Sequence, residues 1–201
     1  MGRTSGYRGV ISLVLLISVF LVLPAGADEV VDSIKAALEQ YKQGEYISAA
    51  ASLDYASQLI REKRSQSLEK FLPEALPGWT SEEATSRTFS TAMLGGGVFV
   101  ESIYRKGMAA VSIKIITDSP MLQSVMMMFT NPLILTASGS KMETIKGHRA
   151  IVDYRPASMD GEIKILVKNS FLIIISGTGV RKEDLANYAS QIDYNKLTEQ
   201  L

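Results

Sequence analysis

The spacing of apolar side chains divides the chain into a helical part and a strand part. Between residues 28 and 68, apolar residues recur every three or four positions, which is typical of amphipathic helices. Gly44 interrupts this pattern and predicts a tight turn between two antiparallel helices. From residue 79 onward apolar and polar residues alternate, as Ile113 and Ile115 do around Lys114, which predicts half-buried strands.

The strand part also contains two helical patterns, one over residues 119–130 and one over residues 181–192. Asp160-Gly161 and Asn169-Ser170 are typical hairpin turns, and such short connections favour antiparallel pairing. The expected strands are VFVESIY, AVSIKIIT, LILTAS, METIK, HRAIVDY, GEIKILVK and SFLIIIS. The predicted fold class is α+β, an N-terminal antiparallel helical hairpin followed by a mostly antiparallel β-sheet packed by two helices.

The first 27 residues have the pattern of a secretory signal peptide. Arg3 and Arg8 precede the apolar run Val10–Leu23, and Ala25 and Ala27 form a small-residue cleavage site. A retained anchor is the alternative, but 14 helical residues reach only roughly 21 Å of a hydrocarbon core of about 30 Å. We therefore expect export to the periplasm or medium, cleavage after Ala27, and no stable membrane span afterwards.

Two prolines and a glycine mark the boundary between the two parts, at Pro73, Pro77 and Gly78. Trp79 follows at once, and we expect it to seal the junction. The predicted organisation is a signal peptide over 1–27, a helical hairpin over 28–70, a linker over 71–78 and an α+β sheet domain over 79–201.

Composition narrows the chemistry further. Outside the first 27 residues the chain has 19 basic and 21 acidic side chains, a balance that predicts no nucleic-acid partner. The absence of cysteine excludes thiol nucleophiles and thiolate metal sites. His148 is the only histidine, and the adjacent pairs Glu82-Glu83 and Glu183-Asp184 do not face each other. We therefore predict no catalytic residue, no metal site and no cofactor.

Residues 41–57, YKQGEYISAAASLDYAS, resemble the middle of a single tetratricopeptide repeat. The matching positions are Gly44, Tyr46, Ala49, Leu53 and Ala56. The resemblance implies a helical hairpin, because small residues let its two helices approach closely. It leaves three roles open, namely packing on the rest of the chain, dimerisation and peptide recognition.

Two further resemblances concern larger parts of the chain. The order of helices and strands over residues 79–201 resembles the layout of PsbP-like α+β sandwiches, a likeness of fold alone. The whole chain also resembles small exported bacterial proteins.

The segment SPMLQSVMMMFTNP contains four of the nine methionines. On a helix, six of its apolar side chains span an arc of about 160°, and Met127 falls on the polar side. The six are Met121, Leu122, Val125, Met126, Met128 and Phe129. We expect this arc to be core, with an adaptable apolar binding site as the alternative, because no methionine pair has the spacing that would hold a metal.

We predict a binding groove between this helix and the sheet, with a glycine turn at its mouth. Its candidate residues are Gly95, Gly96, Gly97, Met121, Val125, Met128 and Trp79. The predicted function is an exported, non-enzymatic binding or interaction protein of the bacterial cell envelope, with a protein or an apolar ligand as partner. The alternatives are a carboxylate-based hydrolase and a self-assembling structural protein of the envelope.

Overall fold

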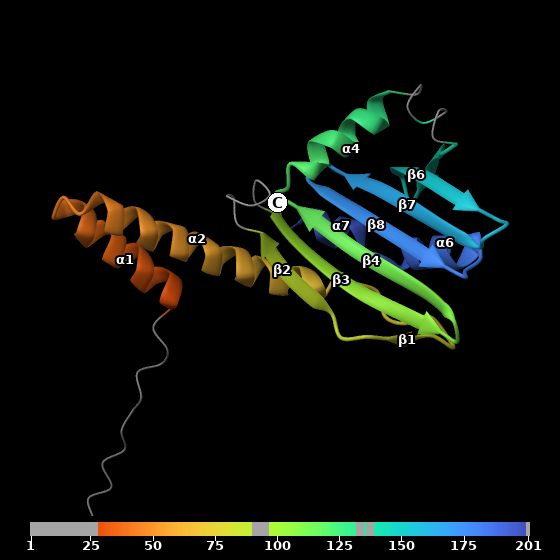
Figure 1. The fold of residues 1–201 in the computed structure, drawn as a ribbon, viewed down its shortest axis with the longest axis horizontal. Helices are drawn as coiled ribbons and strands as arrows, with labels where there is room; N and C mark the ends of the chain where they lie inside the picture. The colour runs from red at the N-terminus through yellow and green to blue at the C-terminus, as the bar shows by residue number, and fades with distance from the viewer. Residues whose placement is uncertain (1–27, 90–96, 132–134, 136–138, 200–201) are drawn as a thin grey trace, which may run out of the picture.

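The computed structural model describes residues 28–89, 97–131, 135 and 139–199. Two helices come first, and an antiparallel sheet with further helices follows, which confirms the predicted α+β class. The helical hairpin projects from one end of the sheet as an arm (Figure 1). Most of its length therefore lies away from the rest of the molecule.

The hairpin is formed by α1 and the longer α2, joined at Gly44, whose positive φ of 81° suits a tight turn. Asp28 begins α1 and accepts a hydrogen bond from the Val30 N–H at 3.2 Å. The helices of the described chain are α1 (Glu29–Lys42), α2 (Tyr46–Glu69), α4 (Met121–Thr130), α6 (Lys182–Gln191) and α7 (Tyr194–Thr198). None of them is long and apolar enough to cross a membrane.

The described strands form one sheet in the order β1-β3-β4-β8-β7-β6-β5, and β2 pairs with β3 beside β1. All neighbouring strands are antiparallel. The strands are β1 (Thr80–Ser81), β2 (Thr85–Phe89), β3 (Gly97–Lys106), β4 (Ala109–Thr117), β5 (Lys141–Ile145), β6 (His148–Arg155), β7 (Asp160–Val167) and β8 (Phe171–Thr178). The expected strand LILTAS lies outside the described residues, apart from Leu135.

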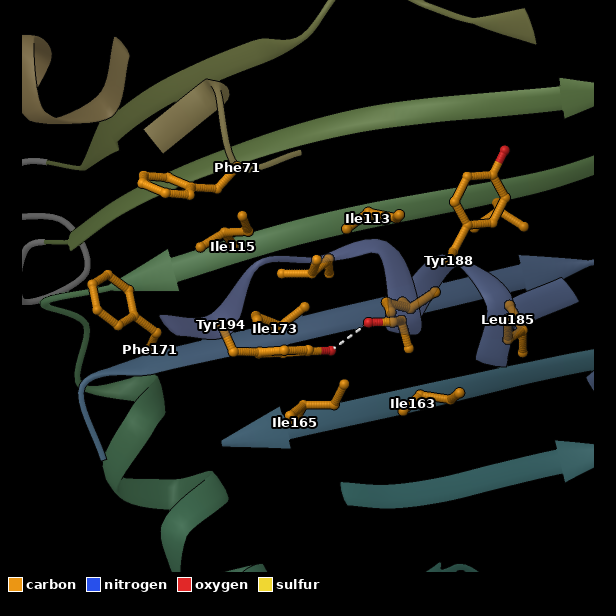
Figure 2. Close-up of a cluster of buried hydrophobic side chains, with 14 of the residues drawn as sticks. Phe71, Ile113, Ile115, Ile163, Ile165, Phe171, Ile173, Leu185, Tyr188 and Tyr194 are labelled. Carbon is orange, nitrogen blue, oxygen red and sulfur yellow. Dashed lines mark hydrogen bonds between the residues drawn. The ribbon is translucent and has the colours of Figure 1, made fainter. Parts of the chain in front are cut away.

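One face of the sheet carries the main hydrophobic core. Isoleucines from β4, β7 and β8 point to the side on which α6, α7 and the end of α2 lie (Figure 2). Tyr194 lies across this core, and its hydroxyl donates a hydrogen bond of 2.7 Å to the Ala189 carbonyl. Leu68 and Phe71 bring the base of the hairpin into the same core, so the arm is anchored at its C-terminal end.

Among the described elements, α4 covers part of the opposite face. Leu122, Val125 and Phe129 are buried against the sheet, and Met127 is 62% exposed as its position on the polar side predicts. Met121 was expected in the core, and that prediction is wrong, since its side chain is 51% exposed. Met121 stands in the first turn of α4, where it lines a hollow on this face of the sheet together with Phe99 and Ile116.

Candidate functional site

A groove of about 330 Å³ lies beside the N-terminal end of α4, on the partly covered face of the sheet. Phe99 of β3, Ile116 of β4 and Met121 of α4 supply its apolar surface. Arg87 of β2 stands at one edge, and Glu101 and Lys114 stand together at another. The groove thus combines an apolar floor with charged edges, which is the common composition of small-ligand sites.

Gly97 allows the start of β3 to pass directly beneath the segment that leads into α4. Its φ is +139°, and a Cβ atom there would lie 3.0 Å from the Ser119 Cβ. A larger residue would push the two segments apart and change the shape of the groove. Gly97 is therefore the candidate glycine for which the structure gives a physical role at the groove.

The charged edges of the groove differ in their partners. Glu101 accepts a hydrogen bond of 2.6 Å from the Ser112 hydroxyl and forms an ion pair of 3.4 Å with Lys114. Arg87 is exposed, and no carboxylate of the described chain forms an ion pair with it. Arg87 is therefore the cation at the groove with which an anionic group of a ligand could pair.

Of the five candidate residues that the structure describes, two line this groove, Gly97 and Met121. Val125 is buried and Met128 half-buried in the interface between α4 and the sheet, and neither lines the groove. Trp79 lies in the main core on the other face, where its ring centroid is 5.6 Å from that of Tyr188. Gly95 and Gly96 lie outside the described residues.

The sequence reasoning missed Arg87, Phe99, Glu101, Lys114, Ile116 and Ser119 as groove residues. The alternation in β4 placed Lys114 and Ile116 on one face, as the structure shows. Their neighbours come from β3 and β2, whose register with β4 is set by long-range pairing. The missing signal was therefore the pairing of the strands, which a single sequence does not display.

Carboxylates gather at one further hollow, of about 320 Å³, which Asp153, Asp160 and Glu162 line. Glu162 forms an ion pair with Lys164 and accepts a hydrogen bond of 3.2 Å from the Ser176 hydroxyl. In the described part of the chain, no three His, Asp or Glu side chains are placed to hold a metal ion. Glu162 is thus held by charged and polar partners, whereas the buried Oδ1 of Asp160 has no hydrogen-bond partner among the described residues.

His148 lies at the edge of the main core rather than in either hollow. Its ring centroid is 4.8 Å from that of Tyr194, and burial lowers the pKa of the imidazole below its usual value. The adjacent carboxylates also have structural partners, since Glu82 pairs with Arg105 and Asp184 accepts a hydrogen bond from the Arg181 N–H. These contacts of His148, Glu82 and Asp184 hold the fold together.

The helical hairpin presents a second and larger surface. Its two helices touch through small side chains, and the buried residues of its outer part are Val30, Ala37, Ala49 and Ala56. Alanine permits a close approach of the two backbones but buries little apolar area. The large apolar side chains of both helices therefore point elsewhere.

Seven of these large side chains form one surface, which we call the apolar flank. The flank consists of Val31, Ile34, Leu38, Tyr41, Tyr46, Leu53 and Ile60, each between 43% and 66% exposed. Tyr41 and Tyr46, with ring centroids 5.6 Å apart, connect the flank residues of α1 with those of α2 near the turn. The hydrogen bond of 2.6 Å from the Tyr55 hydroxyl to Glu29 marks the opposite side of the hairpin.

The apolar flank is unusual for a surface that faces solvent. A fully exposed aromatic side chain presents roughly 150–250 Å² and an aliphatic one less, so the seven half-exposed residues together present on the order of 600–700 Å². Contiguous apolar patches on monomeric proteins measure about 300–600 Å² at most, and larger ones mark interaction sites. The flank is therefore the strongest candidate for a functional surface in the described structure.

Comparison with models of protein families, with curated proteins and with solved structures finds no match. The resemblances to a tetratricopeptide hairpin and to PsbP-like sandwiches thus remain sequence-based predictions.

Proposed function

We propose that this chain is a non-enzymatic interaction protein of the bacterial cell envelope, and that its apolar flank is the surface that binds a partner. The observation that carries the proposal is the exposure of seven large apolar side chains on an arm that projects from the sheet (Figure 1). Burying such a surface against another protein is favourable, because apolar area leaves water. The N-terminal pattern supports the envelope as its location.

The sheet supports this proposal by holding the arm in place. Leu68 and Phe71 fix the end of α2 in the main core, and Arg64 of α2 forms an ion pair with Asp118 ahead of α4. A surface on a helix that is anchored at one end loses less freedom on binding than a free segment would. The sheet is thus the support, and the hairpin is the part that meets the partner.

Photo-crosslinking in living cells tests the proposal directly. The full chain would carry a photoreactive phenylalanine analogue in place of Leu38, on the apolar flank, or in place of Ala51, which is exposed on another side of α2. We expect a discrete protein adduct from position 38 and none from position 51. Equal adducts from both positions, or none from position 38, would contradict the proposal.

The location is tested on the same sample. Peptide sequencing of the purified protein should find Asp28 as the first residue, and the protein should be released with the envelope fraction. An intact N-terminus on a cytoplasmic protein would contradict the envelope part of the proposal and leave the interaction surface unaffected.

The groove beside α4 supports a second candidate function, the binding of a small amphiphile. Its apolar floor suits a hydrocarbon chain, and the unpaired Arg87 suits an anionic end group. Dodecanoate is a suitable probe, and methionine methyl NMR a suitable readout. Binding in the groove should shift the Met121 methyl signal and leave that of Met108, which is fully exposed in the β3–β4 turn, unchanged.

An Arg87→Ala variant should bind dodecanoate more weakly, and an Arg155→Ala variant should bind it as the unaltered chain does. Arg155 is a matched control, because it is an exposed arginine on another strand of the same sheet. Equal shifts at Met108 and Met121 would instead indicate non-specific association and remove this candidate.

A further inference from the structure

We propose that the partner of the apolar flank is a second copy of this chain, and that two hairpins pack face to face as a four-helix bundle. This inference rests on the proposed function, because it names the occupant of the same surface. Three observations carry it: the spacing of the apolar residues, the size of the flank and the charges along its edges.

The spacing is that of a coiled-coil seam on both helices. Val31, Ile34, Leu38 and Tyr41 follow one another at intervals of three, four and three residues. On α2, Tyr46, Leu53 and Ile60 are seven residues apart, with Ala50 and Ser57 at the positions between them. Such a repeat keeps one seam facing a partner helix along its whole length.

The buried alanines occupy the neighbouring repeat positions. Ala37 on α1, and Ala49 and Ala56 on α2, each directly precede a seam position and form the contact within one hairpin. Each helix therefore uses one side for its own hairpin and keeps an adjacent seam free. This is the arrangement of a four-helix bundle, in which every helix has two antiparallel neighbours.

The size of the flank matches what a stable dimer needs. A standard interface buries about 800 Å² on each partner, and the seven side chains alone present on the order of 600–700 Å². A self-complementary surface of this kind forms a closed two-fold dimer and leaves no further flank exposed.

The charged residues along the outer edges of the seams favour one of the ways in which two hairpins could pack. Lys35 follows the seam residue Ile34, and Asp54 follows the seam residue Leu53. Lys35 lies nine residues before Gly44 and Asp54 ten residues after it, so both stand at nearly the same height along the arm. Packing α1 of one copy on α2 of the other brings these opposite charges together at two symmetric places.

The same register also sets Asp28 of one copy, which forms an ion pair with Lys63 of its own hairpin, near Arg61 of the other. In the alternative arrangement, α1 of one copy packs on α1 of the other and α2 on α2, with the two-fold axis at the height of Lys35 and Asp54. This arrangement would instead place Lys35 opposite Lys35 and Asp54 opposite Asp54. Like charges at such edge positions disfavour a pairing. The geometry thus points to a dimer in which both turns lie at one end and both sheets at the other.

Analytical ultracentrifugation of the chain from Asp28 onward tests the dimer. This chain carries every described element, because Asp28 caps the first helix. We expect a concentration-dependent monomer–dimer equilibrium. Leu38→Lys should raise the dissociation constant at least about 100-fold by placing charges in the seam, while Ala51→Lys should leave it within about twofold.

A charge exchange tests the arrangement as well as the dimer. Lys35→Asp or Asp54→Lys alone should raise the dissociation constant roughly tenfold, because each change affects two symmetric ion pairs. The double variant restores opposite charges and should return the constant to within about threefold of the unaltered chain. Additive losses in the double variant would overturn the proposed register.

The outcomes separate this inference from the proposed function. A chain that stays monomeric at high concentration, while position 38 crosslinks to a different protein in cells, overturns the dimer and keeps the interaction surface. A monomeric chain that instead co-floats with anionic lipid vesicles, and loses this with Leu38→Lys, assigns the flank to a membrane surface and overturns both. A dimer that Leu38→Lys and Ala51→Lys affect equally overturns the assignment of the dimer to the flank.

Discussion

The hairpin and the sheet use the same apolar residue types in opposite ways. Ile113, Ile115 and Ile173 in the sheet are completely buried, whereas Ile34 and Ile60 in the hairpin are 45% and 49% exposed. The sheet stabilises itself by burying large side chains under α6, α7 and the base of α2 (Figure 2). The hairpin holds together through alanine contacts and its anchored base, which leaves its large side chains available for another molecule.

The largest expected contrast concerns α4. Phe129→Ala should lower the free energy of unfolding by about 3–5 kcal/mol, because it empties a buried ring site between the helix and the sheet. Met127→Ala on the same helix should change it by less than about 0.5 kcal/mol, since this side chain is exposed. Urea unfolding followed by circular dichroism measures both. A loss of several kcal/mol for Met127→Ala would mean that another element covers that side of α4.

Two isoleucines test the difference between the regions with one chemical change. Ile173→Ala, at the centre of the sheet, should cost about 2–5 kcal/mol of unfolding free energy. Ile60→Ala, on the flank, should cost less than about 0.5 kcal/mol when the protein is dilute enough to be monomeric. Equal losses at both positions would show that the flank belongs to the folded core.

The contact between α1 and α2 should be sensitive to added side-chain volume rather than to removed volume. Ala56→Leu should cost about 1–3 kcal/mol by forcing α1 and α2 apart, whereas Ala51→Leu on the exposed side should have little effect. Amide hydrogen exchange reads this out locally. Faster exchange confined to α1 and the outer half of α2, with the sheet unchanged, would confirm that the hairpin opens on its own.

A further expected effect is the pH dependence of the sheet core. Burial raises the pKa of Tyr188 to about 12, from about 10 in an unfolded chain. The neutral phenol is therefore favoured in the fold, and this contribution is complete below pH 10 and lost between pH 10 and about 12. Stability should fall by up to about 1.4 kcal/mol per pH unit in that window.

Urea unfolding at several alkaline pH values measures this loss, and Tyr188→Phe is the control. The variant should show a shallower alkaline loss than the unaltered chain. An identical pH dependence in both chains would show that Tyr188 stays neutral in the unfolded state as well, or titrates freely in the folded one.

The sequence predicted the structure of the hairpin and that of the sheet to different extents. The change of period near residue 79 and the turn at Gly44 sufficed for the α+β class and for the hairpin. Periodicity shows that a helix is amphipathic, but it does not show which apolar side has a partner within the chain. The alanines at positions 37, 49 and 56 carried that signal, because only small residues allow the close approach seen here.

The candidate groove was predictable only in outline. The helix over 119–130 and the glycine run indicated the correct end of the sheet, and Gly97 and Met121 do line the groove. Arg87 and Phe99 reach it through the pairing of β2 with β3, which forms between segments that are distant from α4 along the chain. The core position expected for Met121 was wrong because this side chain borders an open hollow at the start of α4.

One comparison within α2 tests the central claim most directly. Leu53 and Leu68 are on the same helix, yet Leu53 is 51% exposed on the flank and Leu68 is completely buried in the sheet core. Urea unfolding of the dilute monomer should show a loss of roughly 3 kcal/mol or more for Leu68→Gln and less than about 0.5 kcal/mol for Leu53→Gln. A loss at Leu53 as large as that at Leu68 would contradict the account, because the flank would then be part of the fold.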